Sequence, residues 1–297
     1  MHYFDHAMMS EISPTLFDTC DQLEGASIQH GPNSSRVYLM SMKQGEPTLL
    51  PAAIYQLAKA QGYGKLFAKV RQCESAHFFN HGFTEEARLP GYYPAMGQGV
   101  DEDALLLGAY LDAERRIDIK AAEHEKVLDL ARNNLSKITP AAHWQVITLD
   151  KEYAEEMAHL YREVFPSYPF PIHETGYLCE TMSDNVSYFG IKYKGRLIAL
   201  ASAEQDLDNM AVEMTDFATL PEFRGQQLAA VLLNKMESSM AQLGFRQAFT
   251  IARATSVGMN RTFAKNDYHY QGRLINNTQI SGQIESMNIW CKPLNVG

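Results

Sequence analysis

Residues 214–233 constrain the fold more than any other stretch, because they predict a strand, a tight turn and the start of a helix in immediate succession. Pro221 has no N–H group for a sheet ladder, so it ends the strand. Arg224-Gly225 forms the turn, and from Leu228 onward apolar residues recur at helical spacing. The first N–H groups of such a helix have no internal partner, and the helix dipole adds positive potential. The stretch therefore predicts an anion site suited to a pyrophosphate.

A single segment of this kind occurs in many α/β proteins, so the residues that follow it are needed to identify the fold. Residues 250–260 predict a strand that leads into a loop, residues 259–265 a short helix, and residues 268–274 another strand. The order of strand, helix and strand after the anion turn favours a mixed α/β fold over an all-helical or all-β one.

The same order of elements is predicted twice. Residues 49–60, 65–70, 74–80, 86–93 and 104–111 predict helix, strand, helix, strand and strand, and the second half repeats this order from residue 222 to residue 290. We interpret residues 1–116 as a degenerate, partial copy, residues 117–140 as a linker helix, and residues 141–297 as the complete domain. Chance similarity between two α/β segments is the alternative. The first copy has no Arg-Gly turn, so we expect no anion site there.

Composition excludes several classes of function. The 297 residues are 45% hydrophobic and carry a formal net charge of −9, which argues against nucleic acid and anionic membranes as partners. No apolar run approaches the roughly 20 residues that span a bilayer, and Met1–His6 lacks the regions of a signal peptide, so a cytoplasmic location is expected. The four cysteines form no CxxC pair and the ten histidines show no metal spacing, so no metal is predicted.

The anion turn resembles the coenzyme-A-binding segment of the GNAT acetyltransferases, whose pattern is Arg or Gln, two residues, Gly, one residue, then Gly or Ala. Arg224 and Ala229 fit the ends of the pattern, and Gln227 replaces its central glycine. The resemblance implies an α/β fold with a mixed, mostly antiparallel central sheet flanked by helices, and acetyl-CoA as cosubstrate. It implies coenzyme contacts from Phe217, Ala218, Thr219, Arg224, Gly225, Gln226, Gln227, Leu228, Ala229, Asn260 and Phe263. If Gln227 is helical, its backbone N–H can still bind phosphate, and a helix N-cap is the alternative role for Asn260.

Several further segments resemble the β-lysine N-acetyltransferase family: residues 165–172, 213–221, 258–260 and 285–290, with residues 63–69 in the first half. The resemblance implies acetyl transfer to the ε-amino group of β-lysine, which gives N6-acetyl-β-lysine, a compatible solute in that family. Two alternatives stay open. One is another small amine, such as a polyamine or an amino acid. The other is an acyl-CoA-binding module without catalysis. The sequence also leaves a homodimer open.

The chemistry of amine acetylation requires a base, because an alkyl ammonium has a pKa of about 10.4 and is not a nucleophile at neutral pH. Glu213 is our first candidate and Asp216 our second. Strand alternation places them on opposite faces unless a bulge intervenes, so only one is expected to face the acetyl group. In the GNAT family a Tyr often protonates the leaving thiolate, and Phe263 stands at that place. Tyr268 is a substitute, with core packing as its alternative role.

β-Lysine carries two ammonium groups and one carboxylate, so its site needs acidic side chains for the amines and a cationic or amide group for the carboxylate. The acidic candidates are Glu204 and Glu285, and the candidates for the carboxylate are Arg253 and Asn288. Tyr168 and Phe170 lie between prolines and are expected to wall the methylene chain, although such a segment also packs loops.

Overall fold

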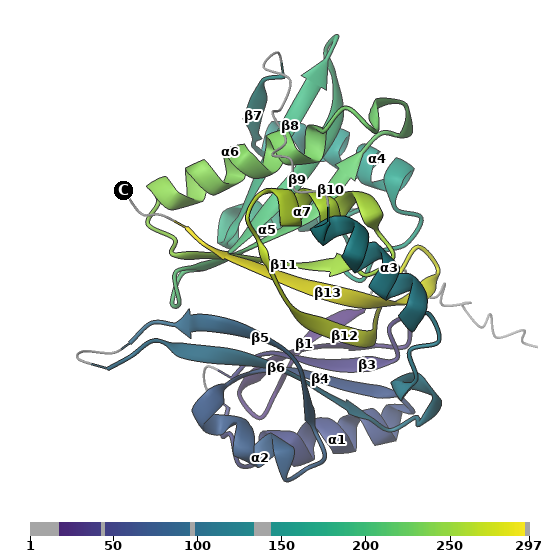
Figure 1. Ribbon diagram of the computed structural model, residues 1–297, viewed down its shortest axis with the longest axis vertical. Coiled ribbons are helices and arrows are strands. Elements are labelled where there is room, and N and C mark those ends of the chain that lie inside the picture. Colours follow the sequence, from purple (N-terminus) through teal and green to yellow (C-terminus); the bar gives the residue numbers. More distant parts are fainter. Residues whose placement is uncertain (1–17, 43–44, 96–98, 134–143, 295–297) are drawn as a thin grey trace, which may run out of the picture.

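The computed structural model describes residues 18–42, 45–95, 99–133 and 144–294. These form one continuous sheet of 13 strands with helices on its faces (Figure 1). The strand order is β1-β2-β3-β4-β6-β5-β12-β13-β11-β10-β9-β8-β7. The strands are β1 (Thr19–Leu23), β2 (Ala26–Gly31), β3 (Arg36–Ser41), β4 (Lys65–Arg71), β5 (Thr84–Tyr93), β6 (Glu102–Tyr110), β7 (Val146–Leu149), β8 (Val186–Tyr193), β9 (Arg196–Asp206), β10 (Ala211–Thr219), β11 (Gln247–Arg253), β12 (His269–Ile280) and β13 (Gln283–Pro293).

The helices lie between the strands much as the hydrophobic periodicity predicts. They are α1 (Leu50–Gln61), α2 (Ser75–Phe79), α3 (Ala121–Arg132), α4 (Ala154–Val164), α5 (Thr175–Asp184), α6 (Leu228–Gln242) and α7 (Val257–Lys265). The mixed, mostly antiparallel sheet flanked by helices is thus confirmed. The predicted helix at 222 begins later: a 3-10 turn at Pro221–Phe223 precedes α6.

The two halves have the same strand connections. In the first half β3 pairs in parallel with β4 across α1, and β6 lies between β4 and β5. In the second half β10 pairs in parallel with β11 across α6, and β13 lies between β11 and β12. The halves meet edge to edge at β5 and β12, where Gly272 pairs with Ala87. This shared topology supports our proposal that residues 1–116 are a degenerate copy of residues 141–297.

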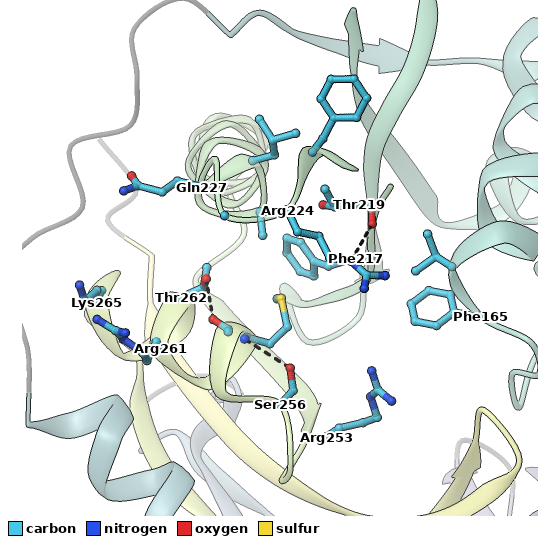
Figure 2. A pocket seen from close by; sticks show the side chains of 17 residues that line it. Phe165, Phe217, Thr219, Arg224, Gln227, Arg253, Ser256, Arg261, Thr262 and Lys265 are labelled. Carbon is cyan, nitrogen blue, oxygen red and sulfur yellow. Dashed lines mark hydrogen bonds between the residues drawn. The ribbon is translucent and has the colours of Figure 1, made fainter. Parts of the chain in front are cut away.

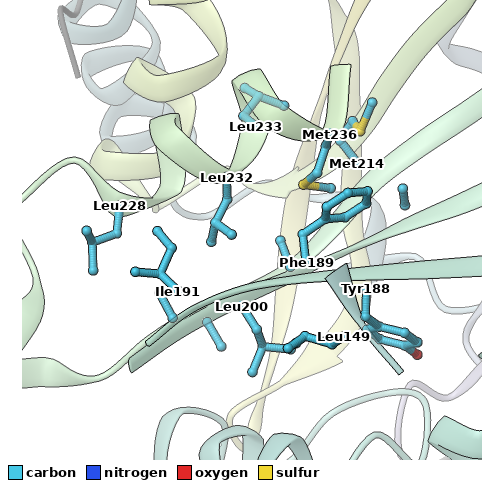
Figure 3. Close-up of a cluster of buried hydrophobic side chains, with 14 of the residues drawn as sticks. Leu149, Tyr188, Phe189, Ile191, Leu200, Met214, Leu228, Leu232, Leu233 and Met236 are labelled. Atoms are coloured by element: carbon cyan, nitrogen blue, oxygen red, sulfur yellow. The ribbon is translucent and has the colours of Figure 1, made fainter. Parts of the chain in front are cut away.

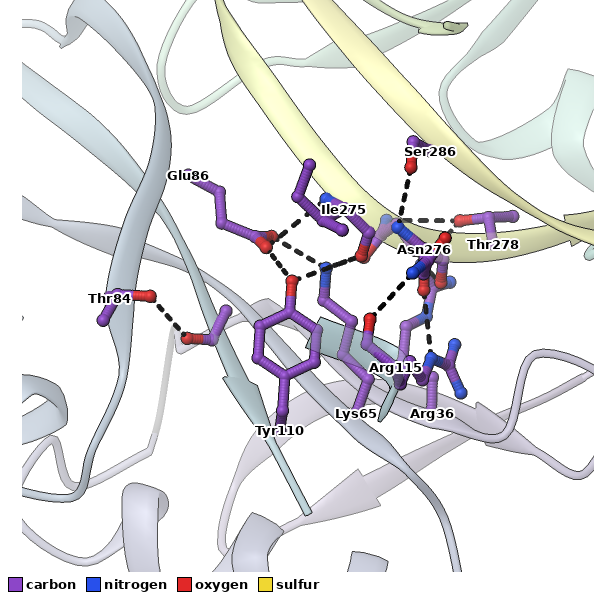
Figure 4. Close-up of polar contacts among 12 residues, drawn as sticks. Arg36, Lys65, Thr84, Glu86, Tyr110, Arg115, Ile275, Asn276, Thr278 and Ser286 are labelled. Carbon is purple, nitrogen blue, oxygen red and sulfur yellow. Dashed lines mark hydrogen bonds and ion pairs between the residues drawn. The ribbon is translucent and has the colours of Figure 1, made fainter. Parts of the chain in front are cut away.

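A buried polar network closes the junction between the halves (Figure 4). Lys65 Nζ donates to Glu86 Oε2 at 2.8 Å and to the carbonyl oxygen of Ile275 at 2.6 Å. The hydroxyl of Tyr110 also donates to Glu86. Arg115 Nε donates to the Asn276 carbonyl oxygen at 3.0 Å, and Asn276 Nδ2 donates back to the Arg115 carbonyl oxygen at 2.8 Å. The first half thus supplies hydrogen-bond partners for the backbone of β12 at the point where the pairing of β12 with β13 shifts register.

The core of the second half lies between α6 and the sheet (Figure 3). Leu228, Leu232 and Met236 recur every four residues and project from one face of α6. They pack against strand residues that include Phe189 and Met214. This packing fixes the start of α6, and therefore the preceding turn, against the end of β10.

Three elements escaped prediction: β1, β2 and α5. β1 is an edge strand whose residues are almost all exposed, so its sequence shows no alternation. The linker helix predicted within 117–140 is α3, and it packs against α7 of the second half. Part of that predicted linker, residues 134–140, lies outside the described residues.

Candidate active site

Strands β10 and β11 separate halfway along their length. They pair in parallel only from Ala211 to Glu213 on β10 and from Gln247 to Phe249 on β11. Beyond this point β10 continues beside β9 alone, and a register shift between Thr215 and Ala218 marks a bulge. The split leaves the edge of β10 beyond Glu213 unpaired on the β11 side, and this edge includes Phe217, Ala218 and Thr219, from which coenzyme contacts are expected.

The turn at the open end of the split holds a row of free backbone donors. Gly225 has φ of +80° and Gln227 has φ of +61°, so both lie in the left-handed region. The N–H groups of residues 225–229 have no acceptor in the described part of the protein, and the first turn of α6 has no acidic residue. Gln227 is the N-cap of α6 and is not helical. Its left-handed conformation explains why glycine suits this position. The geometry is that of an anion site.

A cleft of about 580 Å³ follows this turn (Figure 2). Its described lining includes seven of the predicted coenzyme residues: Phe217, Thr219, Arg224, Gly225, Gln227, Leu228 and Ala229. It also includes cations that the sequence reading did not assign to the coenzyme: Arg253, Arg261 and Lys265. Arg261 and Lys265 are four residues apart on α7, a spacing that places both on one helix face and could have identified them.

Ala218, Gln226 and Phe263 do not line this cleft. Ala218 is fully buried beside the bulge, and Gln226 is an exposed residue of the turn that offers only its backbone N–H. Phe263 is buried and packs edge-to-face on Phe217, 5.7 Å between ring centroids. Its phenyl ring therefore supports the cleft wall from behind.

Asn260 has a structural role that leaves its side chain no capacity for the coenzyme. The amide nitrogen donates to the carbonyl oxygens of Arg253 and Ser256, at 2.9 and 2.8 Å. The amide oxygen accepts from Asn288 Nδ2 and Trp290 Nε1, at 2.8 and 2.9 Å. Asn260 and Asn288 are fully buried. The predicted side-chain contacts of Asn260 with coenzyme and of Asn288 with substrate are therefore wrong: the two amides join α7 to β13.

Tyr268 also belongs to the core. Its side chain is 3% exposed, its ring packs against Phe263 at 5.2 Å between centroids, and it lines none of the described cavities. Burial raises the pKa of the Tyr268 hydroxyl well above its usual range. The prediction that Tyr268 protonates the leaving thiolate is wrong because the hydroxyl is enclosed below α6 and α7.

A second large cavity, of about 570 Å³, lies where the two halves face one another. The second half contributes Glu204, Glu213 and Asp216, and the first half contributes Lys69 and Tyr92 among others. Two small cavities, of about 90 and 80 Å³, share lining residues with it, and the smaller one also shares lining residues with the cleft beside α6. Tyr168, Thr215 and Asp216 line both small cavities. The acidic cavity and the coenzyme cleft thus approach β10 from opposite sides and meet at its bulge.

Glu204 and Glu213 are directly opposite each other on β9 and β10. Neither carboxylate accepts a hydrogen bond or forms an ion pair within the described residues. Burial raises the pKa of both: that of Glu204 lies well above its usual range, and that of Glu213 is about 7, held down by the nearby Lys69. Two facing carboxylates destabilise a sheet unless something cationic separates them. Protonation of one carboxyl group or a cation placed between the two would relieve this repulsion.

Asp216 faces the same cavity as Glu213, because the bulge gives it φ of +53° and reverses the strand alternation. The expectation that only one of the two faces the site is wrong for this reason. Asp216 accepts hydrogen bonds from the Tyr168 hydroxyl at 2.6 Å and from Ser202 Oγ at 2.7 Å. Burial raises the pKa of Asp216 and these bonds oppose the rise. With both oxygens occupied, Asp216 is a weaker candidate for the base than Glu213.

Tyr168 and Phe170, the two predicted wall residues, line cavities near the bulge of β10, and Glu285 lines none of the described cavities. Tyr168 lines both small cavities. Phe170 lines the large acidic cavity and the 90 Å³ cavity. Glu285 is 3% exposed and accepts from Thr255 Oγ1 at 3.2 Å, outside all the described cavities. Its position on β13, opposite Thr278, places it away from the bulge of β10, so its predicted substrate contact is wrong.

Within the described residues, no group of three or more His, Cys, Asp or Glu side chains has the geometry to hold a metal ion. The described helices include none whose length and apolar character would let it cross a membrane.

Comparison with known proteins places this geometry in a family. The model of the acetyltransferase (GNAT) family matches residues 154–268. A β-lysine N(6)-acetyltransferase of Methanococcus maripaludis is 34% identical over 275 residues, which cover 91% of this chain and 97% of that protein. The N-acetyltransferase YodP of Bacillus subtilis is 31% identical over 276 residues, 91% of this chain and 96% of that protein.

A β-lysine N(6)-acetyltransferase of Methanosarcina mazei is 40% identical over 141 residues, 48% of this chain and 52% of that protein. The relatives from Methanococcus and Bacillus match across both halves, so the first half is part of the shared architecture. The family match covers α4 to α7, the elements that build the split strands and the anion turn. The chain belongs to the GNAT family of acetyl-CoA-dependent N-acetyltransferases.

Proposed function

We propose that the chain transfers the acetyl group of acetyl-CoA to the N6 amine of β-lysine. The observation that carries the proposal is the pair of facing carboxylates, Glu204 and Glu213, in a cavity that adjoins the coenzyme cleft at the bulge of β10. Such a pair suits a diamine better than a neutral substrate. The names of the relatives in Methanococcus and Methanosarcina supply the particular amine.

The cleft beside α6 fits acetyl-CoA. The free N–H groups of residues 225–229 would hold the pyrophosphate, and Arg261 and Lys265 would hold further phosphate charge. Phe217 and Thr219, on the exposed edge of β10, would receive the pantetheine arm by strand-like pairing. When bound, acetyl-CoA supplies an activated acetyl thioester.

Glu213 would take the proton from the substrate ammonium, because its carboxylate has no hydrogen-bond partner and its pKa of about 7 suits a base at neutral pH. Asp216, held by Tyr168 and Ser202, would fix the orientation of the same amine. Backbone N–H groups on the edge of β10 that β11 leaves unpaired would stabilise charge on the thioester oxygen. The thiolate would take its proton from water, since Phe263 carries no acid and Tyr268 is enclosed.

The release of free coenzyme A thiol, measured with a panel of amines, tests the proposed function. The panel contains β-lysine, α-lysine, spermidine and 1,4-diaminopentane. We expect the highest kcat/KM with β-lysine, and a single product acetylated at N6 by mass spectrometry. Preferred turnover of spermidine would replace β-lysine with a polyamine. Absence of thiol release with every amine would contradict enzymatic acetylation of this class of substrate.

Gly225→Asp should weaken acetyl-CoA binding about tenfold or more, because it adds a carboxylate beside the free N–H groups and repels the pyrophosphate. A Cβ at Gly225 meets no atom within 4 Å, so steric crowding is not the cause. Gly225→Asn is the matched control: it has nearly the same size and the same tolerance of φ +80° without the charge. Calorimetry on both folded variants separates the effects. Equal affinities for the two variants would contradict an electrostatic role for this turn.

Titration with coenzyme A should saturate at one molecule per chain. At the start of α1, Leu49 and Leu50 occupy the place that corresponds to the turn with free N–H groups before α6. Neither residue lines any of the described cavities. The first half should therefore bind no coenzyme. Two equivalent sites by calorimetry would contradict this assignment.

A further inference from the structure

Lys69 of the first half reaches into the acidic cavity. It lies on β4, and its Nζ donates to the Tyr92 hydroxyl at 3.0 Å and lies 4.8 Å from the centroid of the Tyr92 ring. It forms no ion pair with any described residue, although an ammonium has three donors. Lys69 thus keeps hydrogen-bonding capacity that the protein does not use.

Lys69 is also the only cation in the described lining of that cavity. The same lining includes six acidic residues: Asp184, Glu204, Asp206, Asp208, Glu213 and Asp216. Arg36 lines the neighbouring small cavity, but its guanidinium already donates to the Asn277 carbonyl, Thr278 Oγ1 and Gln29 Oε1. A negatively charged group of a substrate would therefore find one available partner here.

The order of the cavities places Lys69 away from the coenzyme. Asp216 lines the large cavity and both small ones, and the small cavity nearest the cleft also contains Phe217. Lys69 lines only the large cavity. An amine held near Asp216 and Glu213 would extend the rest of its molecule toward Lys69.

We infer that Lys69 binds the carboxylate of the substrate, an inference that rests on the proposed function. The first half thereby makes the enzyme select an amino acid over a polyamine. A polyamine has no group for Lys69 and would leave this ammonium beside its own positive charges. Lys69 lies in residues 63–69, the segment of the first half that resembles the β-lysine enzymes, and this binding role explains why a lysine stands there.

The test compares β-lysine with 1,4-diaminopentane, which is β-lysine without its carboxylate, in the wild type and in Lys69→Met. A charged hydrogen bond contributes about 1.5–3 kcal/mol, so Lys69→Met should lower kcat/KM for β-lysine roughly 10- to 100-fold, mainly through KM. Both substrates are assayed at a pH above the inflection of both proteins, where Glu213 is ionised with or without Lys69. There kcat/KM for 1,4-diaminopentane should stay within about threefold or rise. An equal loss on both substrates would overturn the inference and assign Lys69 to the charge balance of Glu213.

Two further measurements keep the test decisive. β-Lysine amide, assayed with the wild type, removes the carboxylate charge without a mutation and should show a similar rise in KM. An unchanged KM would overturn the inference even if Lys69→Met fails to fold. If no amine is acetylated, calorimetric binding of β-lysine and 1,4-diaminopentane to the wild type with coenzyme A decides the role of Lys69 separately. Tighter binding of β-lysine would support it, and equal binding would overturn it.

Discussion

Glu213→Gln should lower kcat/KM for β-lysine by roughly 10²-fold or more, while the affinity for acetyl-CoA stays within a few-fold. Glutamine keeps the size of the side chain and removes its ability to accept the ammonium proton. The coenzyme cleft does not include Glu213, so the two binding events should separate. Steady-state kinetics and calorimetry on the same preparation measure both effects.

The pH dependence of kcat/KM is a second test of Glu213 as the base. Burial raises the pKa of Glu213 to about 7, and only the ionised carboxylate can accept a proton. Wild-type kcat/KM should therefore rise as pH increases from 6 to 8, with an inflection near 7. Glu213→Gln should lose this inflection and keep only the rise that follows the fraction of free amine. Lys69 holds the pKa of Glu213 down, so Lys69→Met should move the inflection to higher pH.

Two other variants locate the base if Glu213 is not the group that acts. Asp216→Asn should reduce activity less than Glu213→Gln does, because Asp216 is already bonded to Tyr168 and Ser202. The reverse ranking would assign the base to Asp216. Full activity in both would leave Glu204 as the next candidate. Glu180→Gln, on the exposed side of α5, is the control for a neutral glutamine substitution.

The coenzyme cleft was largely predictable because its signals are local. The spacing from Arg224 to Ala229 specifies a turn and a helix start within a few residues, and the structure places seven of the eleven predicted coenzyme residues in the cleft lining. Of the four exceptions, Gln226 is an exposed turn residue, and Ala218, Asn260 and Phe263 are buried by tertiary packing. Asn260 and Phe263 are of suitable chemical type, but partners 25 or more residues away decide that they are buried.

The acidic cavity was less predictable, since it combines strands from both halves. Lys69 and Tyr92 reach Glu213 only because β5 and β12 join two sheets into one, a contact that no local pattern specifies. The bulge at Asp216 has no local sequence signal, because its left-handed residue is an aspartate and not the glycine that usually adopts positive φ. The physical cost of a left-handed Asp is offset by its hydrogen bonds to Tyr168 and Ser202.

Lys65→Met should lower the free energy of unfolding by about 3 kcal/mol or more, because it leaves Glu86 buried without its cation. The side chains of Lys65 and Glu86 are 0% and 7% exposed, so water cannot replace the lost partner (Figure 4). The carbonyl oxygen of Ile275, at the start of the irregular part of β12, loses the shorter of its two hydrogen bonds and keeps only that from the Tyr110 hydroxyl at 3.3 Å. Urea unfolding followed by circular dichroism measures the change.

Two control variants distinguish the loss of the buried Lys65–Glu86 ion pair from the general effect of replacing a lysine with methionine. Lys59→Met, on the exposed face of α1, should change stability by less than about 0.5 kcal/mol. The double variant Lys65→Met with Glu86→Gln should be more stable than Lys65→Met alone, because no uncompensated charge remains. Since the acidic cavity needs both halves, Lys65→Met should also lose amine turnover in urea before wild type does. If Lys65→Met unfolds at the same urea concentration as Lys59→Met, this ion pair does not hold the two halves together.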